Sequence, residues 1–311
     1  MKIERLTLSE FDSLGLRPSN VFGTSDFLQL NAHKAENVMA FTADRRIGVT
    51  MGVADGVWRA PWSAPYLTVS LGTGAEGKTL LDTAALFGRE LRDLLTADTP
   101  VRLTAPPVIY DSPENAFFEG FGRPGDTIIT DTSFYINLKE SEGESTWNKS
   151  ARRNLKKAVT AGLRLIKVDD FEACYNLIST HHAALGYKMA MSADEVRRTA
   201  RIVPVDFWMV FDGNVPLAAM YCYRVRHNTV QVISSGDTPA GRSVGAAVFL
   251  ERGIIDYYRR ELVERQGIED ALLDHGPTSV MGVQNEGLAA FKTSFGCKMS
   301  PKLTLLTGHA T

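Results

Sequence analysis

The segment with the clearest chemical potential is a run of six small and basic residues that follows a predicted strand. It reads R-x-x-G-x-A and comprises Arg242, Ser243, Val244, Gly245, Ala246 and Ala247. Small residues let a ligand approach the backbone, and the free N–H groups of a first helical turn attract anions. The run therefore predicts a loop that holds a pyrophosphate in front of a long helix. The alternative is an ordinary turn in which Ser243 caps the helix.

Acid–base chemistry is suggested by Asp274 and His275, which follow an apolar run at a predicted strand end. A histidine there could take a proton from an attacking ammonium group. The alternative is a structural histidine that is held by hydrogen bonds. Asp237 opens the predicted phosphate loop, where it is either a ligand contact or a turn residue.

Candidates for the acceptor pocket lie on both halves of the chain. His181 and His182 are adjacent on a predicted helix, so they face different directions and do not form a metal pair. One of them could line the pocket with Tyr187 and Lys188. In the first half, aromatic residues including Trp62 and Tyr66 surround a proline-bearing segment. They could floor an acceptor groove, and the alternative for them is core packing.

A predicted helix in the middle of the chain has a basic face. Arg152 and Lys156 are an i,i+4 pair, and so are Arg153 and Lys157. This face is either an ordinary solvated surface or a contact for the phosphates of a donor, whether CoA or tRNA.

The composition is that of a water-soluble globular protein: 311 residues, 44% hydrophobic and 23% charged, with a net charge of −2. A net charge this close to zero does not predict binding to DNA or other nucleic acid through the overall charge of the protein. The three cysteines are widely spaced, which predicts buried structural thiols rather than a metal site. The start lacks the apolar core of a signal peptide, and no apolar run reaches the roughly 18 residues of a membrane span. We therefore expect a cytoplasmic protein without a bound metal or permanent cofactor.

The order of the predicted elements indicates an α+β fold of two domains, 1–130 and 131–311. In the first domain, we expect a short helix capped by Ser25 or Asp26, and then strands joined by hairpin turns at Ala43-Asp44 and Asp55-Gly56. An amphipathic helix over 79–98 follows. In the second domain, the basic helix ends at Gly162 and is followed by a strand and two helices. Three successive antiparallel strands come next. The predicted loop and its long helix, a strand, a helix and a last strand complete this domain.

The later stretch "VQNEGLAAFKTSFGC" contains Asn285 and the pair Phe291-Lys292. Together with the earlier R-x-x-G-x-A run, this order resembles the GNAT acetyltransferase superfamily. There the loop binds the pyrophosphate of an acyl-CoA, and a later helix that contains an asparagine ends in an aromatic residue and a glycine. The resemblance implies that the run 242–247 and Asn285 contact the donor.

A wider resemblance covers most of the chain. The segments "VFGTSDFLQL", "RAPWSAPYL", "SARRNLKKAVTAGL" and "FKTSFG" are similar to Fem-type (FemAB-like) acyl and aminoacyl transferases, which consist of two GNAT-like domains in tandem. No long charged heptad segment is present, so the match is to members without the coiled-coil arm. At the matched position, Lys292 could stabilise an oxyanion or bind donor phosphate. The chain departs from the patterns where many GNAT enzymes carry a general-acid tyrosine, and at Leu273-Asp274-His275-Gly276.

These resemblances imply an N-acyltransferase that moves an acyl group from acyl-CoA to a small-molecule or peptide amine held in a cleft between the domains. One alternative is an aminoacyl-tRNA-dependent transferase that acts on a cell-wall precursor or a small metabolite. A second is a binding protein on the same fold that has lost catalysis, and the missing tyrosine keeps this alternative open.

Overall fold

The computed structural model describes residues 1–73, 77–95, 100–141 and 143–308. The chain divides into two compact units that interleave in sequence. The first comprises Met1–Ser133, Ser279–Gln284 and Ser300–Thr311, and the second comprises Phe134–Thr278 and Asn285–Met299. That the chain has two domains with the limits 1–130 and 131–311 stays a prediction. In the described residues no helix is both long and apolar enough to cross a membrane.

The first unit is a mainly antiparallel sheet with two packed helices. Its strands follow the order β1-β3-β4-β5-β7-β16, with β6 beside β4 and β2 beside β6. The elements are β1 (Ile3–Leu6), α1 (Leu8–Asp12), β2 (Arg17–Pro18), η1 (Val21–Gly23), α2 (Ser25–Asn31), η2 (Ala32–Lys34), β3 (Met39–Ala43), β4 (Ile47–Ala54), β5 (Val57–Ala60), β6 (Val69–Leu71), α3 (Gly77–Leu94), β7 (Val101–Thr104), η3 (Val108–Tyr110), α4 (Pro113–Phe121), β14 (Ser279–Val280), β15 (Val283–Gln284) and most of β16 (Lys298–Leu306).

The hairpins predicted in this unit are confirmed. Strands β3 and β4 pair antiparallel, and so do β4 and β5. Asp44 and Arg45 form the first turn and Asp55 and Gly56 the second, all with positive φ. Such turns match the twist of the flanking strands. The amphipathic helix is α3, and residues 96–98 of its predicted range lie outside the described residues. The predicted cap of α2 is wrong, because Thr24 rather than a later residue occupies the N-cap position.

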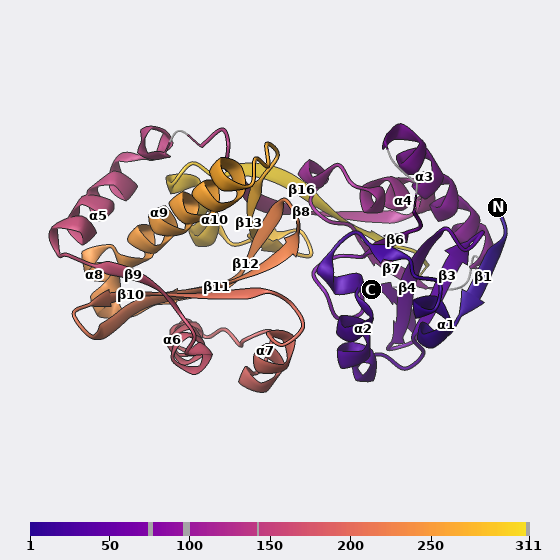
Figure 1. Ribbon diagram of the computed structural model, residues 1–311, viewed down its shortest axis with the longest axis horizontal. Helices are drawn as coiled ribbons and strands as arrows, with labels where there is room; N and C mark the ends of the chain where they lie inside the picture. Colours follow the sequence, from indigo (N-terminus) through magenta and orange to yellow (C-terminus); the bar gives the residue numbers. More distant parts are fainter. Residues whose placement is uncertain (74–76, 96–99, 142, 309–311) are drawn as a thin grey trace. The chain divides into compact units, whose positions relative to one another are not determined.

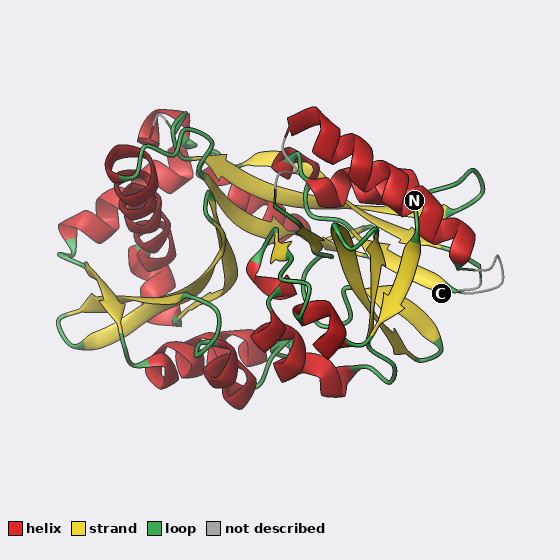
Figure 2. Ribbon diagram, turned by 45° about the vertical axis from the view of Figure 1, so that its right-hand side comes forward, coloured by secondary structure: helices red, strands yellow, loops and turns green. Residues whose placement is uncertain are grey.

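The second unit is a six-stranded sheet with helices on both faces. The strand order is β8-β13-β12-β11-β10-β9. Figure 1 shows α5 and α9 on one side of these strands and α6 on the other, and Figure 2 shows the same helices from a second direction. The elements are β8 (Thr127–Asn137, which begins in the first unit), η4 (Gly143–Thr146), α5 (Lys149–Thr160), β9 (Arg164–Val168), α6 (Phe171–Ala184), α7 (Ala193–Thr199), β10 (Val205–Asp212), β11 (Val215–Arg226), β12 (Thr229–Asp237), α8 (Pro239–Val244), α9 (Ala246–Tyr258), η5 (Arg259–Arg265), β13 (Leu272–Pro277) and α10 (Glu286–Ser294).

Each unit has its own hydrophobic core. In the second unit, the apolar face of α5 (Ala151, Leu155 and Ala158) packs with the buried face of α9, which opposes the central strands. Burial of these faces supplies most of the stability of both helices, because helices of this length are marginal alone. All three cysteines are buried free thiols, as the sequence predicted.

Candidate functional site

Two central strands of the second unit, β12 and β13, separate from each other partway along their length. β12 and β13 are parallel and pair only from Thr229–Leu272 to Gln231–Asp274 in the described register. β12 nevertheless runs on to Asp237, and β13 to Pro277. We call the two ends that do not pair with each other, 232–237 and 275–277, the strand divergence; residues 232–237 still pair with β11 on their other side. Peptide groups that point inward from these ends are not used by a sheet ladder, so they must bond elsewhere or remain free for a ligand.

Lys292, on α10, supplies partners for one side of the strand divergence. Its Nζ donates to the carbonyl oxygens of His275 at 2.6 Å, Gly276 at 3.0 Å and Pro277 at 3.4 Å. Lys292 is only 6% exposed. An ammonium has three N–H donors, and each is taken by one of these carbonyls. In this conformation Lys292 therefore holds the end of β13 instead of pointing a free donor at a ligand.

Asp274 is also engaged inside the second unit. It is fully buried, and its carboxylate accepts hydrogen bonds from Gln231 Nε2 at 3.0 Å and from the Gly276 backbone N–H at 2.8 Å. The bond from Gln231 joins β12 to β13 at the last paired position, and the bond from Gly276 fixes the carboxylate within β13. Asp274 thus fixes the point at which the strands begin to part.

His275 lies in a closed polar cluster with Glu251 of α9. The two residues are 5% and 3% exposed, and His275 Nδ1 is 3.8 Å from Glu251 Oε2. Burial, with the charge of Lys292 as a further cause, lowers the pKa of His275 to about 3. Burial raises the pKa of Glu251 to about 8, and it lowers the pKa of Lys292 to about 8. A neutral, enclosed imidazole of this kind is a weak base, and it has no exposed face for an acceptor.

The segment predicted as a phosphate loop is not a loop. β12 ends at Asp237, Thr238 caps a new helix through its side chain, and Pro239–Val244 form α8. The predicted cap, Ser243, lies inside α8, and its Oγ donates to the Ala240 carbonyl at 2.7 Å. Thr238 followed by proline explains the difference, because a threonine cap and a proline at the first helical position together start a helix.

Gly245 forms the sharp bend between α8 and α9. Its φ is +80°, and a Cβ there would lie 2.3 Å from the backbone oxygen of Asn154 in α5. Ala246 is fully buried, and Ala247 is half-buried behind it. Since α5 presses on this bend, glycine is required both by the backbone conformation and by the close approach.

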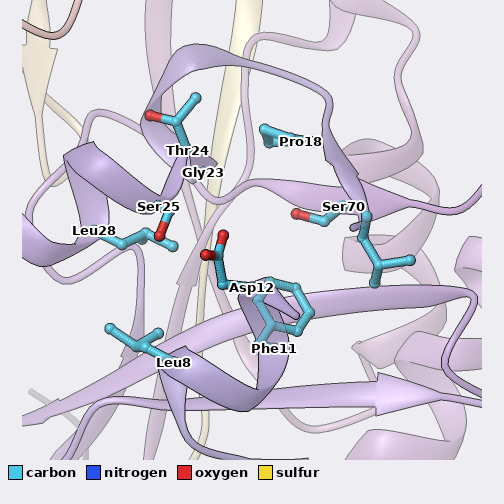
Figure 3. Close-up of a pocket in the computed structure, with 10 residues that line it drawn as sticks. Leu8, Phe11, Asp12, Pro18, Gly23, Thr24, Ser25, Leu28 and Ser70 are labelled. Atoms are coloured by element: carbon cyan, nitrogen blue, oxygen red, sulfur yellow. The ribbon is translucent and has the colours of Figure 1, made fainter. Parts of the chain in front are cut away.

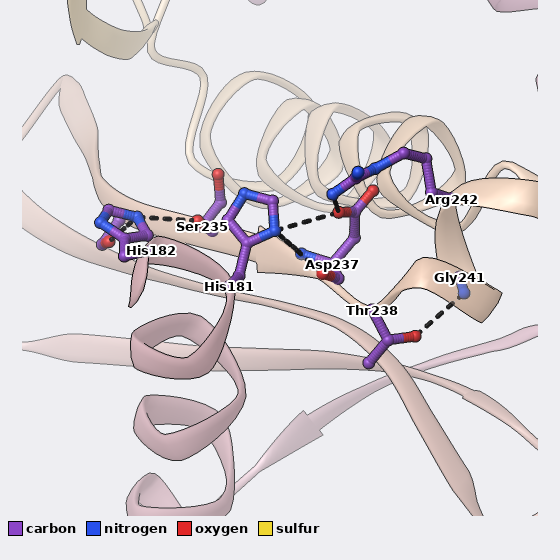
Figure 4. Close-up of polar contacts among 8 residues, drawn as sticks. His181, His182, Ser235, Asp237, Thr238, Gly241 and Arg242 are labelled. Carbon is purple, nitrogen blue, oxygen red and sulfur yellow. Dashed lines mark hydrogen bonds and ion pairs between the residues drawn. The ribbon is translucent and has the colours of Figure 1, made fainter. Parts of the chain in front are cut away.

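Arg242 and Asp237 do lie together, beside a histidine (Figure 4). Arg242 donates from Nη2 to Asp237 Oδ1 at 2.9 Å. The Nδ1 atom of His181, on α6, is 3.1 Å from the same carboxylate oxygen and 2.9 Å from the Asp237 carbonyl oxygen. Asp237 is nearly buried, whereas the Arg242 side chain is 59% exposed. The carboxylate thus links β12, α6 and α8.

A second group of predicted residues meets nearby. Asn285 Nδ2 donates to the Tyr187 hydroxyl at 3.3 Å, and the ring of Tyr187 lies edge-on to His182. His182 Nε2 in turn lies 3.3 Å from the Ser235 carbonyl oxygen, on β12. Lys188 is exposed next to Tyr187. Asn285 also caps α10 by accepting from the Leu288 N–H. This chain of contacts reaches from β12 to the residues that follow β13.

Comparison with solved structures identifies the fold. FemX matches with a TM-score of 0.62 and 10% identity over 98% of this chain and 97% of its own. The chain has the FemX fold. The C-terminal domain of a putative lysylphosphatidylglycerol synthetase from Agrobacterium fabrum matches with a TM-score of 0.58 and 13% identity, over 97% of this chain and 92% of that one. L-PGS from Bacillus licheniformis matches with a TM-score of 0.57 and 11% identity, over 99% of this chain and 94% of its own. No family model and no curated protein sequence matches.

The FemX-like fold confirms the α+β architecture that the Fem-type resemblance implied. At 10% identity the comparison concerns the fold, and it assigns no residue a role. Within this fold the predicted residues separate into an enclosed group and an accessible group. Asp274, His275 and Lys292 are enclosed, whereas Tyr187, Lys188 and Arg242 are exposed.

The aromatic candidates of the first unit belong to its interior. Tyr66 is fully buried and contacts Phe22 and Tyr110 edge-on. Trp62 is half-buried and donates from Nε1 to the Asn31 carbonyl at 3.3 Å. Both residues line a small cavity of about 20 Å³, and their place in an acceptor groove stays a prediction. The first unit also contains a cavity of about 190 Å³, into which the Asp12 carboxylate points (Figure 3).

Several residues of the site were not found from the sequence. In the sequence, Glu251 is a helix residue among apolar neighbours. Its burial in the structure is what distinguishes it from a surface glutamate. Gln231 shows no local signal at all. His181 was predicted only as one of two histidines that could line the acceptor pocket, and nothing in the sequence indicates that Asp237, 56 residues later, is its partner. In the described residues, no group of three potential ligands could hold a metal.

Proposed function

We propose that this protein transfers an acyl or aminoacyl group from a carrier to an amine, and that the transfer takes place at the strand divergence. The observation that carries the proposal is that β12 and β13 pair over three residues and then part. An extended acyl chain or its linker can bond to the unused edge of β12, as an added strand bonds to a sheet edge. The likeness to FemX supports this assignment at the level of the fold.

The reaction needs an amine, an activated carbonyl and a stabilised oxyanion. The amine nitrogen attacks the carbonyl carbon, the oxygen takes the negative charge, and the carrier leaves when the tetrahedral intermediate collapses. Backbone N–H groups of β12 within the strand divergence are suited to the oxyanion, because they are fixed before the reaction begins. Lys292 supports this arrangement by holding the carbonyls of β13. Its predicted direct contact with the oxyanion stays a prediction.

Two observations bear on the carrier. Segment 242–247 is a helix and a bend under Asn154 rather than an open phosphate loop, which weakens the case for acyl-CoA. The exposed face of α5 favours a longer polyanion, because it carries five cations that form no ion pair within the described residues. They are Lys149, Arg152, Arg153, Lys156 and Lys157. α5 packs on α8 and α9 through its opposite, apolar face, so the basic face is turned to solvent. We therefore favour aminoacyl-tRNA as donor, with acyl-CoA as the competing candidate.

The test is transfer with defined donors. Purified protein is incubated with a pool of charged tRNA, or with acetyl-CoA and longer acyl-CoAs, and with a panel of amines. Mass spectrometry detects the amide product. Amide formed from charged tRNA supports the proposal, and amide formed only from acyl-CoA overturns the choice of carrier. If wild-type protein forms no amide from either donor, the transferase proposal is wrong and the binding protein on the same fold is favoured.

The basic face can be tested separately. Reversing two charges, in Lys156→Glu/Lys157→Glu, should weaken tRNA binding and flatten its salt dependence, because each lost phosphate contact removes about 0.7–0.9 from the slope of log K against log salt. The control is Arg265→Glu, a charge reversal on η5 at an exposed arginine that pairs with Glu261. Equal tRNA affinity of the double variant and the control would exclude α5 as the tRNA surface.

A further inference from the structure

His181 is held in one orientation by three groups of a single residue, Asp237 at the end of β12. Its Nδ1 lies 2.9 Å from the Asp237 carbonyl oxygen and 3.1 Å from the carboxylate Oδ1. The Asp237 N–H is 3.3 Å from the same nitrogen, which is the longest of the three contacts. Two oxygen acceptors at shorter distance favour the tautomer with the proton on Nδ1. The lone pair then lies on Nε2, which has no hydrogen-bond partner among the described residues and points away from Asp237 (Figure 4).

The backbone is adapted to this contact. A Cβ at Gly236 would lie 2.8 Å from the Cβ of His181 and 3.1 Å from the Cα of Ile178. Glycine at this position lets α6 approach β12 closely enough for the imidazole to reach Asp237. Arg242 fixes the Asp237 carboxylate, because it donates a hydrogen bond to Asp237 Oδ1 at 2.9 Å. The carboxylate is therefore fixed from two sides before any ligand arrives.

The charged and titratable groups around His181 are few. On its own helix, the ring of His182 lies with its centroid 5.9 Å away. From β12 comes Asp237 and from α8 comes Arg242. The His181 side chain is 18% exposed. It is thus accessible, unlike the enclosed His275, and its second nitrogen is free, unlike Nε2 of His182, which lies against β12.

We propose that His181 is the general base of the transfer, with Asp237 as its positioning residue. This inference rests on the proposed function. The protonated acceptor R–NH₃⁺ gives one proton to His181 Nε2, and the imidazolium that forms is stabilised by the Asp237 carboxylate. The neutral amine attacks, and a C–N bond forms while the carbonyl π pair moves to oxygen. Collapse breaks the bond from carbon to the carrier oxygen, which takes the second proton of the attacking nitrogen. His181 then releases its proton to solvent.

The test separates base catalysis from a structural role. His181→Asn keeps an N–H near the Nδ1 position and removes Nε2, and His181→Gln serves if the first variant does not fold. The acceptors are an alkylamine, which is protonated at neutral pH, and hydroxylamine, which is mostly neutral there. Loss of a general base should lower kcat/KM for the alkylamine by about 10²–10⁴-fold. The rate with hydroxylamine should fall less than tenfold, and the acid limb of the pH profile should disappear with the alkylamine.

The matched control is His227→Asn, at the exposed turn that precedes the other end of β12, which should leave both rates unchanged. Asp237→Asn should shift the acid limb of the profile, because it removes the charge that stabilises the imidazolium. An equal loss of rate with both acceptors, or full activity of His181→Asn, would overturn the assignment while leaving the transferase intact. No turnover by wild-type protein with either acceptor would instead overturn the transferase proposal itself, and this inference with it.

Discussion

Replacing Lys292 with methionine should destabilise the second unit strongly. Methionine has similar length and flexibility, so it fills the space of the lysine chain with little strain. It cannot donate, and the carbonyls of His275, Gly276 and Pro277 lose their shared partner. Each buried acceptor left without a partner costs about 1–3 kcal/mol. Relief from burying the ammonium, whose pKa is lowered to about 8 by that burial, offsets part of this loss. We expect a net loss of about 3 kcal/mol.

Urea unfolding followed by circular dichroism measures this loss, with unchanged m-values as evidence for a comparable transition. The matched control is Lys298→Met. Lys298 also forms a charged hydrogen bond, 2.7 Å to Glu140, but both side chains are more than half exposed. Screening by solvent limits such a pair to at most about 1 kcal/mol. If Lys292→Met is no more destabilising than Lys298→Met, the claim that Lys292 maintains the strand divergence is refuted.

Two further predictions concern buried charge and the bend between α8 and α9. Because the pKa of Glu251 is raised from 4.5 to about 8 by burial, the folded state keeps a proton that the unfolded state has lost between these pH values. Its contribution to stability is complete below about pH 4.5 and is lost as the pH rises towards 8. The free energy of unfolding of Glu251→Gln, relative to that of wild type, should therefore rise by about 3 kcal/mol from pH 5 to pH 7.5. Urea unfolding of both proteins at the two pH values measures this change. Parallel pH dependence of the two proteins would contradict the raised pKa. Gly245→Ala should lower the free energy of unfolding clearly more than Gly213→Ala in the same assay. Both glycines have positive φ, but only Gly245 faces a backbone oxygen, whereas Gly213 has open space. Equal costs would show that Asn154 does not press on the bend.

Local sequence signals predicted the elements well where the signal and the structure share one cause. The turns at Asp44 and at Asp55-Gly56 were predicted because such residues tolerate the backbone of a hairpin turn, and they occupy it. The basic helix ends where expected, since Gly162 takes a positive φ one residue after the C-cap. In these places a single residue preference decides the local structure.

The prediction failed where two signals overlapped. The R-x-x-G-x-A run was interpreted as a loop, although Thr238 and Pro239 immediately before it are a helix start. The second signal is stronger physically, because a proline at the first helical position already has a helical φ and lacks the N–H that would go unpaired. The conformation of Gly245 permits a close contact with α5, and its expected contact with a phosphate stays a prediction.

The electrostatics of the site lay beyond the sequence for a different reason. Glu251, His275 and Lys292 belong to three elements that are distant along the chain, and their pKa shifts arise from shared burial. No local pattern encodes which surfaces of α9, β13 and α10 face one another. The pairing of His181 with Asp237 is a tertiary contact of the same kind.

The most direct test of the central claim is a crystal structure with a donor analogue that cannot react. A short RNA that carries an aminoacyl group through an amide at its 3′ end serves for the favoured carrier, and a CoA thioether serves for the competing one. We predict that the acyl group of a bound analogue lies along residues 232–237 of β12, within reach of His181 Nε2. An acyl group bound in the cavity beside Asp12, or anywhere away from β12 and β13, would contradict the claim that transfer takes place at the strand divergence.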